Sequence, residues 1–263
     1  MEYFTNQNLP NKCSEGVIVD YRISEESINS LTSLGIHVLK SCKVNNLYSA
    51  VCGHPDMQIH HLGNNRFVCT PETYEHYMRI LPDAELIKAS KMLTEHYPDD
   101  ICYNTAVFGK YVICNAVSTA IEILSEYQRR GKTILNANQG YAKCSICIVN
   151  ENAIITADEG VNKIAKSSGI DVLKINEGYI TLKDMSYGFI GGATGLIAPD
   201  TLAVNGDIKT HKDCDNIISF CKNHRVDVLS LKKGEIEDIG SILAIFWLPS
   251  IIKSDLSYFD FIN

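Results

Sequence analysis

Several features that would point to particular partners are missing from this chain of 263 residues. It has no excess of basic residues, because 24 lysines and arginines face 31 aspartates and glutamates, which gives a net charge of −7. Nucleic acids and anionic membranes attract basic surfaces, so neither is an expected partner. No apolar run is long enough to span a bilayer, and the longest, 242–252, contains Pro249.

Other absences bear on the compartment and on the number of domains. The first residues, Met1-Glu-Tyr-Phe, have neither the basic nor the apolar part of a secretory signal. Ten cysteines without such a signal predict reduced, mostly buried thiols in the cytoplasm. No linker rich in proline, glycine or serine divides the chain. We therefore expect one domain over residues 1–263, with an N-terminal arm at 1–12 and a C-terminal extension at 249–263.

A repeated pattern occupies most of the chain. Five segments each consist of an apolar strand, a polar helix and a second apolar strand, and internal repeats of this length indicate a repeat architecture. Their first strands begin at residues 17, 67, 111, 153 and 202. Thr70-Pro71 offers a helix N-cap followed by proline at the first helical position. Gly35, Gly131 and Gly169 follow helical segments, where a left-handed C-cap favours glycine.

One further strand, rich in small residues, accompanies each repeat. The five strands are 50–60, 101–108, 143–149, 189–197 and 238–246. Four of them enter the next repeat through a short turn such as Gly109-Lys110, which is typical of a β-hairpin. The fifth would close a ring by pairing with the first strand, 17–20. Because a hairpin before every helix disfavours an open parallel sheet, the sequence predicts an α/β fold, a five-bladed α/β propeller of ββαβ units.

The stretch Gly53-His54-Pro55-Asp56 places chemistry-bearing side chains close together. On an extended strand His54 and Asp56, two residues apart, would put an imidazole and a carboxylate on one face. A turn is the alternative, because the residue types in this stretch also suit turns.

A ring of five ββαβ units with Gly-His-x-Asp on an inner strand resembles the pentein, or guanidine-modifying, superfamily. This group includes arginine and agmatine deiminases, dimethylarginine hydrolases and amidinotransferases. The resemblance implies that His54 is an acid/base and that Asp56 holds a guanidinium nitrogen. It also implies a nucleophilic cysteine two blades later, where the chain reads Gly140-Tyr-Ala-Lys-Cys144-Ser. For Cys144, a buried strand cysteine is the alternative.

The same resemblance implies a catalytic carboxylate one blade before the histidine. On a ring this is the fifth blade, whose strand follows Gly-Glu-Ile-Glu-Asp-Ile-Gly at 234–240. Glu237 is the better match to the catalytic glutamate, and Glu235, the second match, is expected to contact the substrate. The cysteine motif then lies mid-chain rather than at the end, as in a circular permutation.

One strand departs from the family pattern. An Arg-Asp pair is expected in the blade after the cysteine, but the chain reads Phe-Ile-Gly-Gly-Ala-Thr-Gly at 189–195. A planar guanidinium is best bound by two carboxylates. Gly191 and Gly192 would instead leave room for a ligand that is larger or less charged than arginine or agmatine. Asn104 would line the same pocket with a neutral polar group, or simply fill its strand.

No metal and no cofactor is expected. Cys144 and Cys147 form a CxxC pair, but the chain has no second CxxC and no HxxxH to complete a zinc site. The glycine-rich stretch 188–195 lacks the GxGxxG spacing of a dinucleotide site.

Two functions stay open, both with a small molecule as partner. The first is a C–N hydrolase or amidinotransferase-like enzyme that acts on an amidine or guanidine-like compound by covalent cysteine and histidine chemistry. The second is a catalytically inactive pentein-fold binding protein. The rotated order and the missing aspartate favour the second. Cys144 and His54 facing each other across one central pocket would favour the first. The sequence does not fix the oligomeric state.

Overall fold

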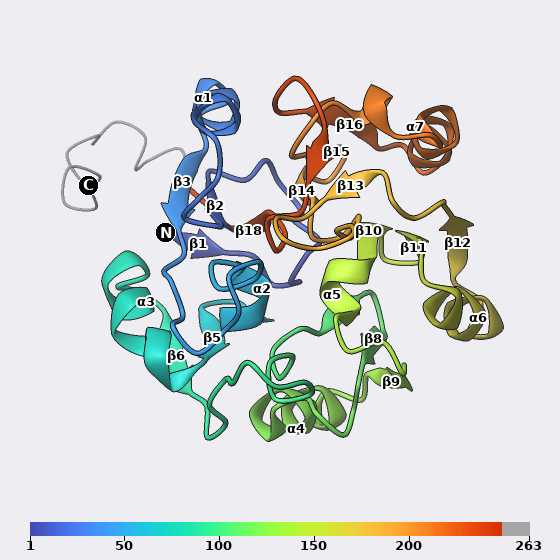
Figure 1. The fold of residues 1–263 in the computed structure, drawn as a ribbon. Coiled ribbons are helices and arrows are strands. Elements are labelled where there is room, and N and C mark those ends of the chain that lie inside the picture. The colour runs from blue at the N-terminus through green and yellow to red at the C-terminus, as the bar shows by residue number, and fades with distance from the viewer. Residues whose placement is uncertain (249–263) are drawn as a thin grey trace.

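One strand order recurs five times in the computed structural model, which describes residues 1–248. In each unit two antiparallel strands are followed by a helix and by a third strand parallel to the second. The units surround a common centre, and their longer helices lie at the rim (Figure 1). The ladders stay separate sheets rather than one closed sheet, so the molecule has a mixed α/β fold.

The five units have similar element lengths. In order around the centre they are β18 (Leu243–Trp247), β2 (Gly16–Val19), α1 (Glu25–Ser33) and β3 (His37–Lys40); β4 (Ile59–Gly63), β5 (Arg66–Cys69), α3 (Tyr74–Ile80) and β6 (Glu85–Lys88); β7 (Ala106–Phe108), β8 (Tyr111–Cys114), α4 (Ile121–Arg129) and β9 (Thr133–Asn136); β10 (Ile146–Asn150), β11 (Ala153–Thr156), α6 (Glu159–Ser167) and β12 (Asp171–Lys174); and β14 (Thr194–Ala198), β15 (Thr201–Val204), α7 (Cys214–Asn223) and β16 (Asp227–Ser230).

Short elements join and supplement these units. They are β1 (Glu2–Tyr3), α2 (Pro55–Gln58), α5 (Ala142–Ser145), β13 (Ile180–Thr181) and β17 (Ile236–Glu237), with single 3₁₀ turns at Pro71–Thr73 and Ile208–Thr210. Strand β13 pairs with β17 in parallel, and β1 pairs with β18, so part of the expected arm at 1–12 is a strand. The expected extension at 249–263 lies outside the described residues.

The two ends of the described chain meet in one sheet. Strand β18 runs antiparallel to β2, with Leu243 opposite Ile18 and Ala244 opposite Val17. This is the pairing of the fifth inner strand with the first strand that the sequence predicts. The glycine signals also hold, since Gly35, Gly131 and Gly169 have the left-handed φ of a C-cap. Thr70-Pro71 instead begins a 3₁₀ turn, and the Thr70 side chain makes no capping hydrogen bond.

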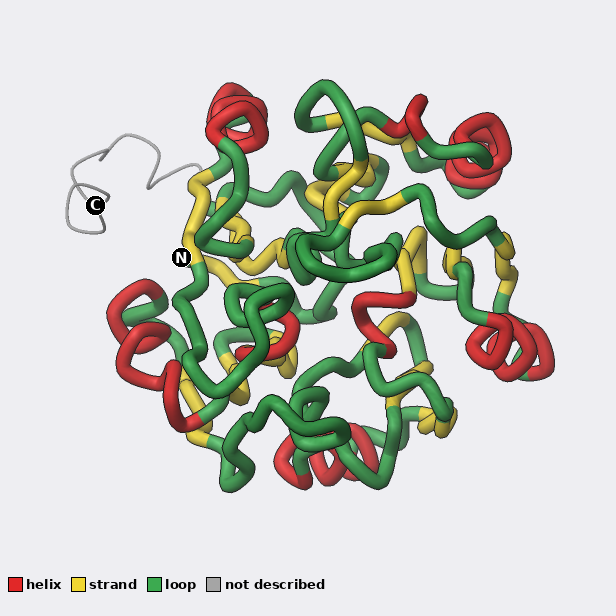
Figure 2. The backbone as a smooth tube through the Cα atoms, viewed as in Figure 1, coloured by secondary structure: helices red, strands yellow, loops and turns green. Residues whose placement is uncertain are grey.

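The inner strands begin later in the chain than the sequence predicts. Residues 50–58 form turns and the one-turn helix α2, and only Ile59 starts β4; likewise Cys144 lies in α5, and β10 starts at Ile146. Pro55 has no N–H for a ladder, which favours the turn. His54 and Asp56 therefore do not share the face of a strand. Figure 2 shows such loop and turn segments near the centre, inside the outer helices.

The apolar core is divided among the units, between their strands and their outer helices. Polar contacts join neighbouring units, as where α4 packs on β4. Tyr127 on α4 hydrogen-bonds His60 Nε2 through its hydroxyl at 2.6 Å. Burial lowers the pKa of His60 to about 3, so this buried ring is neutral. Within the described residues, no helix has the length and apolar character needed to cross a bilayer.

A second polar contact between neighbouring units is the cluster around Glu126. Its carboxylate accepts hydrogen bonds from Arg66 of β5 at 2.9 Å and from Arg129 and Arg130 at 2.8 and 2.7 Å. Partial burial favours the neutral acid, but the three guanidinium groups outweigh it and lower the pKa of Glu126 to about 2. The ionised form therefore stabilises the fold above pH about 4.5, and this contribution is lost as pH falls through about 2.

We expect Glu126→Gln to lower the free energy of unfolding at pH 7 by about 1–3 kcal/mol, an amount reduced for solvent screening. The difference from the unchanged protein should shrink as pH is lowered from 5 towards 2. Urea unfolding at each pH measures it. Glu75→Gln, at an exposed position of α3, is the control and should have little effect. An equal loss at every pH would contradict the assignment.

Candidate active site

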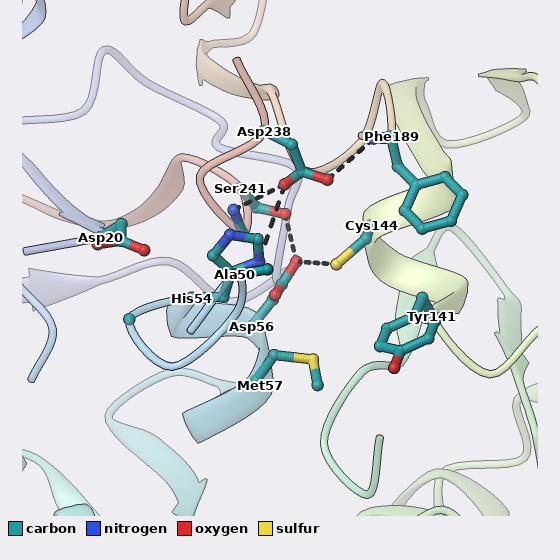
Figure 3. A network of polar contacts seen from close by, with 12 residues as sticks. Asp20, Ala50, His54, Asp56, Met57, Tyr141, Cys144, Phe189, Asp238 and Ser241 are labelled. Carbon is teal, nitrogen blue, oxygen red and sulfur yellow. Dashed lines mark hydrogen bonds and ion pairs between the residues drawn. The ribbon is translucent and has the colours of Figure 1, made fainter. Parts of the chain in front are cut away.

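Polar side chains from three parts of the chain converge at the centre of the molecule (Figure 3). His54 and Asp56 come from the turn and helix before β4, Cys144 comes from α5 before β10, and Asp238 and Ser241 lie between β17 and β18. All five are at least nine-tenths buried. One nitrogen, oxygen or sulfur ligand atom from each of His54, Asp56 and Cys144 lies within 4.8 Å of the others.

Asn104 fixes the peptide that carries Cys144. Its side-chain oxygen accepts the backbone N–H of Lys143 at 2.7 Å and that of Cys144 at 3.2 Å. Its amide nitrogen donates to the Cys144 sulfur at 3.1 Å. The structure thus brings Asn104 to the site, where it contacts the thiol.

Asp56 lies directly behind the thiol. Its Oδ2 accepts the Cys144 S–H at 3.1 Å and is 2.8 Å from the hydroxyl of Ser241. Its Oδ1 has no hydrogen-bond partner among the described residues, and Asp56 is one of the residues that line a separate cavity of about 30 Å³. This volume holds a water molecule, because one water needs about 10–15 Å³ by the same measure.

Burial and the charges around Cys144 keep its sulfur protonated. Burial is the main cause that raises the pKa of the Cys144 thiol well above its ordinary value, and the carboxylates of Asp56 and Asp238 add to it. The hydrogen bond from Asn104 opposes this effect but is weaker. A neutral thiol is therefore the form of the free protein.

His54 faces the second carboxylate. Its Nδ1 lies 3.8 Å from Asp238 Oδ1, and neither ring nitrogen has a hydrogen-bond partner among the described residues. Asp238 is held by backbone N–H groups of Phe189 at 2.9 Å and Gly240 at 3.0 Å. Burial nevertheless raises the pKa of Asp238. His54 thus has a carboxylate near one ring nitrogen, and no described group hydrogen-bonds the other.

The turn that carries His54 is fixed from outside the site. Arg22 donates to the carbonyl oxygens of Ser49 and Ala50 at 2.6 and 3.0 Å and forms a bidentate pair with the buried Asp20. A Cβ on Gly53 would lie 2.4 Å from the Asp20 carboxylate, so this position requires glycine.

The structure does not bring Glu237 to the site. Its carboxylate pairs with Lys232 at 2.7 Å and its side chain is 45% exposed, while Glu235 is exposed. Asp238 takes the position at which Glu237 was expected. Side chains alternate along the β17 strand, so Asp238 follows the fully buried Ile236 to the inside. That alternation is the sequence signal that identifies the aspartate.

The two glycines do not open space for a ligand. A Cβ on Gly192 would lie 2.0 Å from Asp238 Oδ1, and one on Gly191 would lie 2.3 Å from the carbonyl oxygen of Ile146. The space beside Gly192 is therefore filled by Asp238. The site has two carboxylates, Asp56 and Asp238, and the strand at 189–195 contributes none, as the sequence shows.

A buried lysine is the nearest positive charge. Lys143 donates to the Ser241 hydroxyl at 2.8 Å, and that hydroxyl contacts Asp56, so Ser241 bridges the two charges. Burial lowers the pKa of Lys143, whereas Asp56 and Cys144 act in the opposite direction. Ser241 has φ +80°, an unusual conformation for a residue other than glycine.

A cavity of about 260 Å³ opens onto the thiol and the imidazole. Its walls are mostly aromatic and apolar. The lining residues are Tyr48, Val51, His54, Tyr141, Cys144, Leu182, Met185, Ser186, Tyr187, Phe189 and Asp238. Cys144 and His54 thus face one pocket, as an enzyme requires.

Residues 18–243 match a family of unknown function, DUF6873. The chain belongs to this family. No curated protein matches the sequence significantly.

The fold of this DUF6873 chain is that of the pentein superfamily, which confirms the resemblance read from the sequence. An amidinotransferase of saxitoxin biosynthesis from Microseira wollei has a TM-score of 0.54 at 13% identity, over 87% of this chain and 91% of that chain. An agmatine deiminase from C. jejuni has 0.53 at 9%, over 86% and 90%. DDAH from Pseudomonas aeruginosa has 0.55 at 9%, over 89% and 100%.

The DUF6873 site also has three potential metal ligands, from His54, Asp56 and Cys144. A nitrogen, an oxygen and a sulfur ligand suit zinc better than magnesium or calcium. The sequence predicts no metal, and this stays a prediction. Assays of the thiol should include a chelator, because a metal on these three groups would block it.

The contact between Gly192 and Asp238 predicts a specific steric effect. We expect Gly192→Ala to destabilise the fold by about 1–3 kcal/mol because its Cβ overlaps the carboxylate. Chemical unfolding measures this. Combining it with Asp238→Ala should recover part of the loss, since the overlap is then removed. Gly160→Ala on α6, where the nearest atom is a side-chain oxygen at 3.2 Å, is the control.

The carboxylate of Asp56 predicts a change in thiol reactivity. We expect Asp56→Asn to lower the pKa of Cys144, because one cause that raises it is removed. Alkylation of Cys144 by iodoacetamide at pH 8, followed by peptide mapping, should then be several-fold faster. Cys147, whose pKa burial raises to about 11, is the internal control. An unchanged or slower rate at Cys144 would show that Asp56 does not control the thiol.

Proposed function

We propose that this protein is an enzyme that acts on a C–N bond of a guanidine- or amidine-like small molecule through a covalent bond to Cys144. One observation carries the proposal: Cys144, His54 and two buried carboxylates converge where a single cavity ends. The similar solved structures support it, since their names describe amidinotransferases, deiminases and DDAH. We further propose that the five units form a five-bladed propeller and that the protein works in the cytoplasm, where its ten free thiols would stay reduced.

Binding of a cation is the first step. Asp238 lines the cavity, so a planar amidinium beside Cys144 would meet its carboxylate, while Asp56 lies behind the sulfur with Oδ2 at 3.1 Å and would act on the cation at longer range. The two negative charges that raise the thiol pKa are then partly offset. The thiol pKa falls only when the ligand is present, and the S–H proton passes to His54.

Attack and departure follow. The Cys144 thiolate forms a bond to the central amidine carbon, and the C–N bond to the leaving amine breaks. His54 returns the proton to that amine, so the amine leaves neutral and an S-linked amidinium remains on Cys144. Asp238 keeps the imidazole oriented and stabilises its charged form.

The second half of the reaction decides the type of enzyme. Water, losing a proton to His54, would release a urea-type product, whereas an acceptor amine would receive the amidino group. The similar structures include enzymes named for each outcome. Both routes restore the thiol and share the S-linked intermediate, so a test of that intermediate covers both.

A binding protein without catalysis is the second candidate. The neutral Cys144 thiol, hydrogen-bonded to Asp56 in the free protein, favours it. The two candidates differ in whether the sulfur forms a bond with a ligand.

Trapping the intermediate tests the proposal. One similar structure is named as a DDAH His-to-Gly variant in an adduct with S-methyl-L-thiocitrulline. We expect His54→Gly, incubated at a pH high enough to ionise the thiol without His54, to accumulate an adduct of an S-methylisothiourea, because methanethiolate departure needs little protonation whereas water attack needs His54. Intact mass and peptide mapping should place it on Cys144.

The variants separate the two candidates. Cys144→Ser in the same background should form no adduct, whereas the matched Cys147→Ser should retain it. In the unchanged protein, guanidines should release ammonia or an amine, and Cys144→Ser should lower this rate at least 10³-fold. Binding without any adduct or release would establish the binding protein instead.

A further inference from the structure

The residues that line the cavity are mostly apolar towards its mouth and polar beside the thiol. Seven of its eleven lining residues are aromatic or aliphatic. In Figure 3 the rings of Phe189 and Tyr141 lie on the Cys144 side, and His54 and Asp56 lie across from them. The polar chemistry is thus confined to one end of the cavity, and the rest offers apolar surface.

The tyrosine hydroxyls are engaged within the protein. Tyr141 donates its O–H to Asp100, and its oxygen lies 2.9 Å from the hydroxyl of Tyr48. Tyr141 and Phe189 stack with ring centroids 6.2 Å apart and an angle of 26°. What these residues offer a ligand is the faces and edges of rings, which favour apolar groups and cations.

No described lysine or arginine lines this cavity. Asp238 lines it, and Asp56 lies behind the thiol, so the charged side chains nearest its inner end are carboxylates. Lys143 is buried behind the site and bonded to Ser241. A carboxylate on a ligand would therefore meet like charges and no counter-ion.

The mouth is also apolar. Met185 is 50% exposed and Tyr187 is 37% exposed, and both lie on the loop between β13 and β14. The hydroxyl of Ser49 donates to Asp184 of this loop at 3.1 Å, which joins two sides of the mouth. A ligand that extends from the thiol towards solvent would contact these side chains.

We infer that the ligand is a monocationic guanidinium or amidinium with an apolar body, preferably aromatic, and without a carboxylate. The assignment of the cationic head rests on the proposed function, whereas the assignment of the body rests on the cavity walls. Benzylguanidine should bind more tightly than agmatine, whose second ammonium has no partner on the walls. Agmatine should bind more tightly than arginine, which adds a carboxylate.

Binding is measured separately from turnover by calorimetry on Cys144→Ser. The probes are benzylguanidine, agmatine and arginine, with benzyl alcohol as the neutral control. Benzylguanidine should bind at least tenfold more tightly than arginine, and benzyl alcohol should bind weakly. Arginine binding as tightly as benzylguanidine would overturn the inference, and so would the failure of all probes to bind.

A charge placed at the mouth tests the reason for the preference. Met185→Arg would supply the missing counter-ion, and arginine affinity should rise about tenfold relative to agmatine. Met78→Arg is the matched control, since Met78 is 46% exposed but lies on the outer helix α3, and it should leave the ratio unchanged. A ratio that Met185→Arg does not change would show that the walls do not select against the carboxylate.

Failure of the proposed function gives a different result. If the binding order holds but the unchanged protein forms no adduct and releases no product, the cavity selects these ligands without catalysis. If guanidines are turned over but arginine is bound and used as well as benzylguanidine, the enzyme assignment stands and the inference about the body falls.

Discussion

The burial of two carboxylates beside a thiol is the constraint on which this site depends. Removing a charge from water costs several kcal/mol unless hydrogen bonds and opposite charges offset it. Asp238 receives two backbone N–H groups, and Asp56 receives the S–H of Cys144 and the hydroxyl of Ser241. Lys143 supplies one positive charge, and the Ser241 hydroxyl bridges its ammonium group to Asp56. Burial is the main cause that raises the pKa values of Asp238 and the thiol, and the neighbouring carboxylates add to it because the centre is short of positive charge.

The fold assembles this cluster from turns that precede inner strands. Each ladder fixes where its strand begins, so the residues just before the strand are held at the centre without belonging to a sheet. His54 lies before β4, Cys144 lies before β10, and Asp238 lies shortly before β18. Strand β18 pairs with β2, and β2 with β3, whose chain continues towards His54. The pairing of the chain's two ends is therefore part of what brings Asp238 to the imidazole.

The sequence predicts the repeated units, the glycine C-caps and the pairing of the fifth inner strand with the first strand, because these follow from apolar periodicity and local backbone preference. It offers the turn at Gly53–Asp56 only as the alternative to a strand, and it does not predict α5, since small buried residues look like strand residues. The sequence prediction also places the catalytic carboxylate at Glu237, one position before Asp238, which is the residue at the site. Whether Gly192 borders empty space or a side chain depends on a segment 46 residues away, and no local pattern contains that contact.

The lack of positive charge near the thiol and the apolar walls of the cavity act on different parts of a ligand. Near the thiol, a cation would relieve the excess negative charge and, in the proposed mechanism, convert the S–H into a nucleophile, so reactivity would depend on occupancy. Along the walls, the absence of a described lysine or arginine sets what the cation is attached to. A neutral molecule would fill the cavity without changing the thiol pKa, and a zwitterion would place its carboxylate against apolar walls near two aspartates. Only a cation with an uncharged body satisfies both ends, so the selection follows from the same burial of Asp56 and Asp238 that keeps Cys144 protonated in the free protein.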